Sequence, residues 1–341
     1  MKKNWVILLC IILLSVQFLA AQKPTVEILT AGTNTSLRGL SVVNDNVVWV
    51  SGSAGTVAKS SNGGKNWKWM TVKGFEKTEF RDIEAFDAST AIIMGIGEPA
   101  YILKTTDGGD TWKVVYENKT KGMFLDAMDF FNNQQGMVVG DPINNKVFLA
   151  ATSDGGDTWK ELEDLRPIAD SGEAFFAASG TNIKVFENKK IFIVSGGIRS
   201  RLFTESGVTD LPIIQGKETT GANSIDVYDN GNGKGSKQMV IVGGDFKADS
   251  SSEKNCFITT DGGKTWKASK EPPHGYRSCV EYLSKDDLLS CGLTGVDYSF
   301  NGGKTWEWIS KESFHVCRIA KLGTAIYLAG NNGKIGKIVW K

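Results

Sequence analysis

Short apolar segments with alternating polar positions recur along most of the chain. One unit shows the pattern well: residues 80–86 (FRDIEAF) alternate, residues 90–97 (TAIIMGIG) end in glycine, and residues 100–106 (AYILKTT) alternate again. A fourth segment, residues 112–117 (WKVVYE), follows a short polar turn. Period-two alternation, β-branched and aromatic residues and glycine-rich breaks are typical of strands. The unit therefore predicts four antiparallel strands, and almost no helix is expected.

The polar turn is repeated. Its spelling, Ser/Thr-x-Asp/Asn-Gly-Gly-x-Thr/Asn-Trp, occurs five times and starts at residues 60, 105, 152, 259 and 299. The intervals of 45, 47, 107 and 40 residues leave room for one unit that lacks the turn, and residues 181–213 supply its four strands. Four strands in each repeat of about 45 residues is the pattern of a β-propeller.

The two ends of the chain complement each other. After the last turn come three predicted strands and no fourth, whereas residues 25–40 resemble the stretch from a fourth strand into the next first strand, residues 67–83. An N-terminal strand that completes the last unit removes the exposed sheet edge. The sequence predicts an all-β, seven-bladed propeller of four-stranded antiparallel blades, a single domain over residues 22–341 whose ring is closed by the N-terminal strand.

The turn has a local explanation that needs no ligand. An Asp or Asn side chain accepts hydrogen bonds from backbone N–H groups just ahead of it, the glycines tolerate positive φ, and the Trp anchors the turn by packing. Calcium takes six or more oxygens, and one carboxylate for each turn is too few, so no metal is expected. The expected structural residues are Asn62, Trp67, Asp107, Trp112, Asp154, Trp159, Asp261, Trp266, Asn301 and Trp306.

This spelling resembles the Asp box, or bacterial neuraminidase repeat (BNR). The chain from residue 22 onward is similar to the photosystem II stability/assembly factor-like propellers, in its five boxes, their spacing and second strands that end in Gly-Gly, as at residues 242–244. The resemblance implies boxes between the third and fourth strands, on the face away from the functional groove. It also implies an assembly or stability role outside the cytoplasm, with an arginine-bearing face that meets a protein partner.

Residues 1–21 differ from the repeats. Lys2 and Lys3 precede an apolar run from Trp5 to Ala20, and Ala20 and Ala21 are small. This pattern is typical of a secretory signal peptide, with an uncleaved membrane anchor as the alternative. No other segment is apolar enough, over a sufficient length, to cross a bilayer. We expect an exported protein, periplasmic or extracellular, with no integral membrane segment after cleavage.

The charge balance and the cysteine content limit the classes of partner and cofactor that the chain is expected to bind. The chain has 39 Lys and Arg against 38 Asp and Glu, which does not favour a nucleic-acid partner. An exported compartment permits disulfides. The spacing of the four later cysteines shows no zinc or redox motif, and no cofactor is expected. Those cysteines are Cys256, Cys279, Cys291 and Cys317. Buried free thiols are one possibility, and a bridge between Cys279 and Cys291, across the turn at residues 284–287, is the other.

Candidate binding residues lie where first strands begin and in loops between second and third strands, because these share the end opposite the boxes. The link of residues 159–181 is longer than its counterparts, and insertions in one repeat often map to the binding face. Arg side chains there would suit an anionic group, unless each pairs with a neighbouring Asp. The candidates are Arg38, Arg81, Asp82, Asp126, Asp141, Glu173, Asp245, Arg277 and His315.

We interpret the chain as a non-catalytic scaffold that binds a protein or glycan partner. The alternative is a sialidase-like glycan hydrolase, but the early Arg-Ile-Pro signature of such enzymes is missing. The chain also has no G-x-S-x-G, no C-x-x-C-H and only two histidines. Such a hydrolase would use Arg38, Arg81 and Arg277 on a substrate carboxylate, with Tyr276, Glu173 and Asp126 as its catalytic groups.

Overall fold

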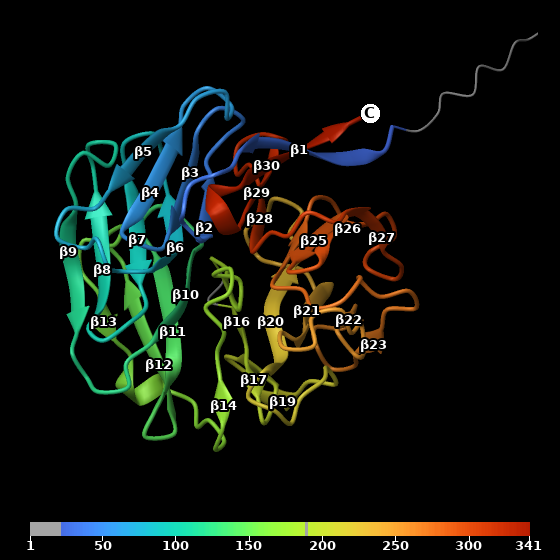
Figure 1. Ribbon diagram of the computed structural model, residues 1–341. Coiled ribbons are helices and arrows are strands. Elements are labelled where there is room, and N and C mark those ends of the chain that lie inside the picture. Colours follow the sequence, from blue (N-terminus) through green and yellow to red (C-terminus); the bar gives the residue numbers. More distant parts are fainter. Residues whose placement is uncertain (1–21, 188–189) are drawn as a thin grey trace, which may run out of the picture.

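A computed structural model describes residues 22–187 and 190–341 (Figure 1). The predicted signal peptide, residues 1–21, lies outside the described residues. Seven antiparallel sheets follow one another in chain order, which confirms the all-β, seven-bladed propeller. In the described ranges the only helical elements are two short 3-10 turns, η1 (Glu163–Leu165) and η2 (Asn331–Gly333).

Each blade runs from an innermost first strand to an outermost fourth strand. Blade 1 contains β2 (Leu37–Val42), β3 (Val48–Gly52), β4 (Thr56–Ser60) and β5 (Lys68–Thr71). Blade 2 contains β6 (Phe80–Ala85), β7 (Ala91–Gly95), β8 (Ala100–Thr105) and β9 (Lys113–Asn118). Blade 3 contains β10 (Leu125–Phe130), β11 (Gly136–Ile143), β12 (Lys146–Thr152) and β13 (Lys160–Glu161).

The later blades follow the same order, and blade 4 is the unit without a box. Blade 4 contains β15 (Ile183–Val185), β16 (Ile191–Val194), β18 (Arg201–Thr204) and β19 (Gly207–Asp210). Blade 5 contains β20 (Thr220–Val227), β21 (Met239–Asp245), β22 (Cys256–Thr259) and β23 (Lys267–Ala268). Blade 6 contains β24 (Cys279–Tyr282), β25 (Leu288–Gly292), β26 (Gly295–Ser299) and β27 (Glu307–Ser310).

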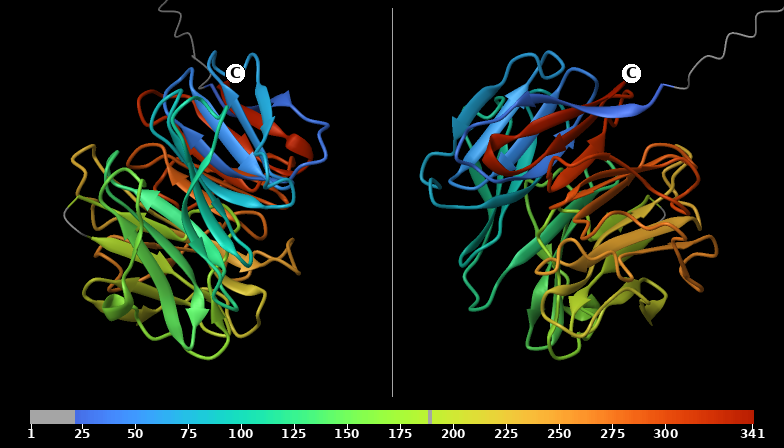
Figure 2. Two further views of the ribbon diagram at one scale, coloured as in Figure 1. Left: turned by 90° about the vertical axis from the view of Figure 1, so that its left-hand side faces the viewer. Right: turned by 45° about the vertical axis from the view of Figure 1, so that its right-hand side comes forward.

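Blade 7 is built from both ends of the chain. It contains β28 (Val316–Ile319), β29 (Ile326–Ala329), β30 (Ile335–Trp340) and, outermost, β1 (Pro24–Thr30). β1 pairs antiparallel with β30, with Pro24 opposite Trp340, and Figures 1 and 2 show the blue and red strands side by side. The predicted closure by the N-terminal strand is therefore confirmed, and β1 covers the edge that β30 would otherwise expose.

The core lies between neighbouring blades. All five residues of β3 and all five of β7 are buried, because these second strands have a strand on either side and a blade against each face. Outer strands such as β9 are largely exposed or half-buried. This arrangement explains why second strands read as continuous apolar runs, whereas the outer strands are mixed.

The Asp boxes lie between the third and fourth strands of blades 1, 2, 3, 5 and 6. In the second box, Thr105 Oγ1 donates to Asp107 Oδ1 at 2.8 Å, and that oxygen accepts the Thr111 N–H at 3.0 Å. Asn301 accepts the Thr305 N–H at the same distance of 3.0 Å. In the third box, hydrogen bonds, chiefly from Thr158, lower the pKa of Asp154 to about 2. The polar groups of the box thus bond to one another within the turn.

One sheet departs from four strands. β14 (Glu173–Ala174) pairs with β17 (Gly196–Gly197), which pairs with β20, so the blade 5 sheet has six strands. The backbones approach closely, because a Cβ on Gly221 would lie 2.3 Å from Gly196 Cα. Gly221 also has φ of +133°, which favours glycine. The long link after the third box is thereby held against blade 5.

Candidate functional site

Beyond β14, the long link after the third box crosses the central channel. We call this part of the link, residues 175–180, the plug. Ala178 O accepts a hydrogen bond from Arg38 of blade 1 at 3.2 Å, and Ser179 Oγ donates to Ser278 O at 2.7 Å, beside blade 6. Ser179 O accepts from Arg318 of blade 7 at 3.2 Å. The plug therefore contacts blades on the far side of the ring and separates a hollow at one end of the channel from the hollows at the other.

The first hollow, the mouth pocket, lies at the end where first strands begin. Antiparallel pairing puts Leu37, the start of β2, beside Gly52, and puts Val48 beside Ser60, where the box begins. The mouth pocket and the boxes are thus at opposite ends of the blades. Its volume is about 430 Å³, and its lining residues are Arg38, Arg81, Phe124, Asp141, Ala174, Phe175, Phe176, Ala177, Ala178, Asn223, Phe246, Tyr276, Ser278, Leu293 and His315.

Two arginines supply positive charge to the mouth pocket. Arg81 pairs with Glu79 at 2.6 Å, and its guanidinium lies 5.9 Å from the centre of the Phe124 ring. Within the described part of the chain, Arg38 forms no ion pair, and its hydrogen bond goes to the backbone of Ala178. Burial and, after it, the charge of Arg81 lower the pKa of Arg38. An anion between the two guanidiniums would relieve this repulsion.

Aromatic rings form one wall of the mouth pocket. Phe176 of the plug meets Phe246 edge-on with ring centres 5.9 Å apart, and Phe246 meets Tyr276 at 6.2 Å. The Tyr276 hydroxyl donates to Asn223 Oδ1 at 2.7 Å, which fixes the ring between blades 5 and 6. This wall offers flat apolar surface beside the guanidiniums.

Asp141 and His315 also line the mouth pocket. Asp141 Oδ1 accepts the Phe175 N–H at 2.8 Å, and burial raises the pKa of Asp141 to about 6. His315 Nε2 lies 2.9 Å from Asn331 Oδ1, so this nitrogen carries the proton. Burial first, and then Arg38, lower the pKa of His315 to about 4. His315 is therefore neutral at neutral pH.

Three acidic candidates do not line the mouth pocket. Asp82 is buried, accepts the N–H groups of Ile83 and Met128 at 2.8 and 2.7 Å, and lines the hollow on the other side of the plug. Burial raises the pKa of Asp82 to about 7 and that of Asp126 well above its usual range. Asp245 is buried, and its Oδ2 lies 3.5 Å from Lys217 Nζ.

Two further candidates, Arg277 and Glu173, form buried ion pairs. Arg277 is fully buried and donates through Nε to Asp297 Oδ2 at 2.7 Å. Glu173 pairs with Arg201 and accepts a hydrogen bond from Ser195 Oγ. Neither side chain lines the mouth pocket.

These positions do not form the constellation of a sialidase-like hydrolase. Arg38 and Arg81 share the mouth pocket, but Arg277 is held by Asp297. The proposed Tyr276 nucleophile is bonded to Asn223, and burial raises its pKa, which opposes formation of the phenolate.

The sequence reasoning missed Ser278 and three large apolar pocket residues, Phe124, Phe246 and Leu293. Phe124 directly precedes β10, and Phe246 and Leu293 directly follow the second strands β21 and β25. They therefore lie in the links into first strands and in the loops between second and third strands, the same positions from which the charged candidates were chosen. Attention to apolar as well as charged residues in those loops would have found them.

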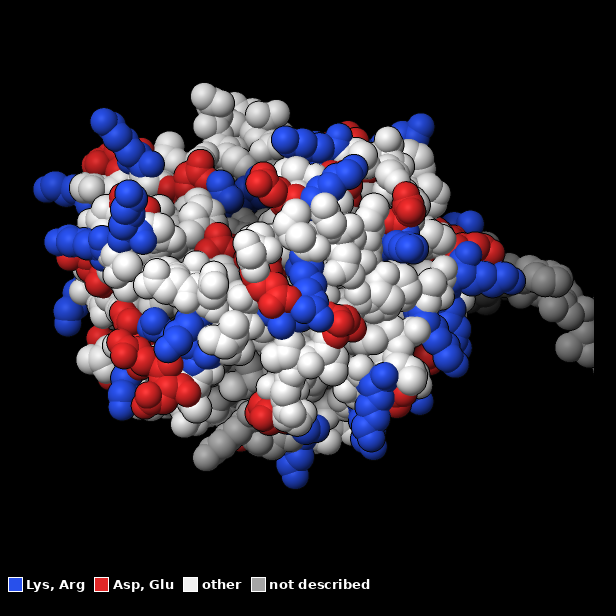
Figure 3. Space-filling view, turned by 90° about the horizontal axis from the view of Figure 1, so that it is seen from below, with Lys and Arg blue, Asp and Glu red and all other residues white. Residues whose placement is uncertain are grey.

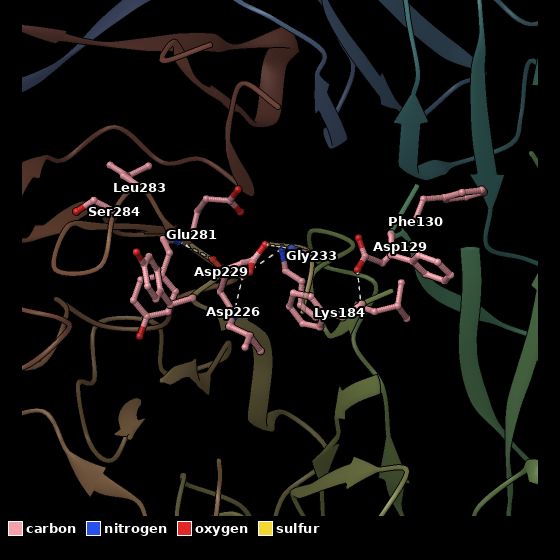
Figure 4. A pocket seen from close by; sticks show the side chains of 15 residues that line it. Asp129, Phe130, Lys184, Asp226, Asp229, Gly233, Glu281, Leu283 and Ser284 are labelled. Carbon is pink, nitrogen blue, oxygen red and sulfur yellow. Dashed lines mark hydrogen bonds and ion pairs between the residues drawn. The ribbon is translucent and has the colours of Figure 1, made fainter. Parts of the chain in front are cut away.

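Another hollow lies at the box end of the channel, where first strands end, and it shares Asp129, Lys184 and Glu281 with the hollow that Asp82 lines. Figure 4 shows four carboxylates around it, those of Asp129, Asp226, Asp229 and Glu281. Lys184 pairs with Asp226 at 3.1 Å, so cationic and anionic groups are neighbours here. Figure 3 shows the same mixture of Lys and Arg with Asp and Glu over the face seen from below. That face lacks the single-sign patch typical of nucleic-acid binding.

Over residues 22–187 and 190–341, no helix reaches the length and apolar character that a membrane span requires.

Comparisons with known proteins agree with the repeat and the ring. The family model described as photosynthesis system II assembly factor YCF48 matches residues 20–123, and the BNR/Asp-box repeat model matches residues 257–268. No curated protein matches the chain.

Several solved propellers share the fold. YCF48 from Cyanidioschyzon merolae is 15% identical with a TM-score of 0.67, and the match covers 92% of this chain and 98% of that one. A structure described as YCF48 bound to D1 peptide is 16% identical with a TM-score of 0.64, covering 92% and 97%. The WD40 propeller domain of Doa1 is 12% identical with a TM-score of 0.61, covering 93% and 97%.

Proposed function

Because the chain is a photosystem II assembly factor-like propeller with BNR repeats, we propose that it is an exported, non-catalytic scaffold that binds a segment of a protein partner in the mouth pocket. One observation carries the proposal. Arg38, which forms no ion pair within the described residues, lies beside Arg81 and an aromatic wall at the end of the ring away from the boxes. An anionic group from a partner would complete this site.

The chemistry of the pocket selects the class of partner. Guanidinium forks bind carboxylates through paired hydrogen bonds, and such bonds strengthen where water is excluded. The rings of Phe176, Phe246 and Tyr276 provide adjacent surface for an apolar or aromatic side chain. A peptide segment with a carboxylate next to an apolar residue fits both features.

Two further observations support a protein partner outside the cytoplasm. The YCF48 structure described as bound to D1 peptide shares the fold of this chain, so a propeller of this shape is able to hold a peptide. The basic start and apolar run of residues 1–21 are those of a signal peptide. We therefore place the partner in the periplasm or outside the cell.

A peptide array that covers the envelope proteins of the host tests this function. The wild-type chain and a Lys264→Ala variant, altered in an exposed side chain of the fourth box, should bind the same carboxylate-bearing peptides. The Arg38→Ala/Arg81→Ala variant should bind none of them. Equal binding by all three proteins would show that the mouth pocket is not the site. Turnover of a fluorogenic glycoside by the wild-type chain would instead favour the hydrolase.

A further inference from the structure

Three of the four cysteines meet at the boundary between blades 6 and 7. Cys279 in β24 is the direct cross-strand neighbour of Cys291 in β25. Cys317 in β28 faces them from the next blade, with its Sγ 3.7 Å from that of Cys279. All three sulfur atoms lie within 4.8 Å of one another, and all three residues are fully buried. We propose that this cluster is a three-coordinate site for a soft cation, copper(I).

The distances suit a metal ion. A metal–sulfur bond is about 2.3 Å long, so three sulfur atoms around one ion in a plane stand about 4 Å apart. The 3.7 Å between Cys279 and Cys317 is already near this value. The other two sulfur–sulfur distances are at most 4.8 Å, so side-chain rotation has to bring the sulfur atoms closer by less than 1 Å.

The number and type of ligands select the ion. Zinc in structural sites takes four ligands, and among the described residues no histidine or carboxylate joins the three thiols. Soft thiolates select copper(I), which accepts three of them. Calcium and magnesium require oxygen ligands and are excluded.

Neighbouring groups already stabilise negative charge on sulfur. Cys279 Sγ accepts hydrogen bonds at 3.4 Å from the Cys317 N–H and at 3.4 Å from Arg318 Nη1. One Cu⁺ with three thiolates carries two negative charges, so a guanidinium in contact with the cluster lowers the cost of burying it. Binding releases the thiol protons and leaves the metal as Cu⁺, so no electron is transferred.

Arg318 also gives the cluster a route to solvent. On one side it contacts Cys279, and on the other it lines the hollow that Asp82 also lines, beside the plug. Movement of this one side chain would open a path from the channel to the sulfur atoms. The bound ion would link blade 6 to blade 7, the blade that both chain ends complete, and should stabilise the closed ring.

Anaerobic titration of the reduced, folded protein with Cu⁺, in competition with a chromogenic Cu⁺ chelator, tests the proposal. The wild type should retain one ion per chain with a near-ultraviolet thiolate-to-copper absorption, and its Tm should rise. Cys256→Ser is the matched control, because Cys256 is equally buried but lies outside the cluster, where its Sγ accepts from Ser269. It should behave as the wild type does.

The cluster variants decide the outcome. Cys279→Ser, Cys291→Ala and Cys317→Ala should each lose the absorption and the rise in Tm. If a variant does not fold, the wild-type stoichiometry and its shift in Tm remain the test. The proposal is wrong if the folded wild type retains no Cu⁺, or if the variants retain as much as the wild type. It is also wrong if mass spectrometry finds a disulfide within the cluster of the freshly isolated protein.

Discussion

Arg38 and Arg81 line the same pocket, and the charge of Arg81 contributes to the lowered pKa of Arg38. Arg81 has a carboxylate partner in Glu79, whereas Arg38 is held by the backbone oxygen of the plug at Ala178. Two like charges kept together at the cost of repulsion indicate a site that is completed by an anion. This relationship is the basis of the proposed function.

Arg38→Ala should weaken peptide binding strongly without unfolding the ring. A charge-assisted hydrogen bond contributes about 1.5–3 kcal/mol, which corresponds to a roughly 10- to 100-fold increase in Kd. Arg38→Lys keeps the charge but loses the paired hydrogen bonds of a guanidinium. Its Kd should therefore lie between those of the wild type and Arg38→Ala. Isothermal titration with a peptide found on the array measures these affinities. An unchanged Kd in Arg38→Ala would exclude a direct contact.

Glu173→Gln should reduce stability and leave peptide affinity unchanged. Glu173 is buried against Arg201, and removal of one partner from a buried pair costs about 3–5 kcal/mol, because the other charge stays uncompensated. Urea unfolding measures the loss, and titration of the fraction that remains folded measures affinity. A variant of normal stability that no longer binds peptide would show that Glu173 contacts the partner.

A chain that begins after Thr30 should lose the closed ring. β1 pairs with β30 along its whole length, so its removal exposes the edge of β30 and lowers the Tm. The exposed edge should also promote association, which size-exclusion chromatography detects. The control begins at Gln22 and keeps β1. A truncated protein that stays monomeric with an unchanged Tm would contradict closure as a source of stability.

His315 should make the protein less stable as the pH falls from about 6.5 to 4. Burial and Arg38 lower its pKa to about 4, whereas the unfolded chain takes up this proton near pH 6.5. The unfolded state binds more protons in this window, so up to about 3 kcal/mol of stability, present above pH 6.5, is lost on acidification.

His315→Gln should be less sensitive in the same window, because Gln keeps a neutral donor for Asn331 and does not titrate. The free energy of unfolding of both proteins, from urea curves at pH 7 and 5, gives the difference. Asp141, whose raised pKa of about 6 has the opposite effect on stability, is present in both. Identical pH dependence in the two proteins would contradict a buried neutral His315.

The repeat made the architecture predictable. Box spacing, the boxless unit near residues 181–213 and the missing fourth strand after the last box together lead to seven blades and to closure by β1. These signals can be read locally, because every blade except blade 7 is one continuous segment of chain, and the missing fourth strand marks blade 7 as the exception. The added strands β14 and β17 were not predicted, since they depend on a close approach of Gly196 and Gly221 that no local pattern encodes.

The site was predictable only in outline. The loop positions gave Arg38, Arg81, Asp141 and His315, all of which line the mouth pocket. The sequence did not distinguish them from Arg277 and Glu173, because the partners Asp297 and Arg201 lie 20 and 28 residues further along the chain. The thiol cluster was missed for the same reason, since Cys317 reaches Cys279 from a different blade.

The most direct test of the proposed binding site is photo-crosslinking from the two opposite ends of the blades. Phe246 at the mouth pocket and Phe300 in the last box have similar exposed fractions, 36% and 44%, so each is replaced in turn by a photoreactive analogue. We expect covalent adducts with the partner from position 246 and none from position 300. Adducts from position 300 alone would place recognition on the Asp-box end and contradict the proposed binding site.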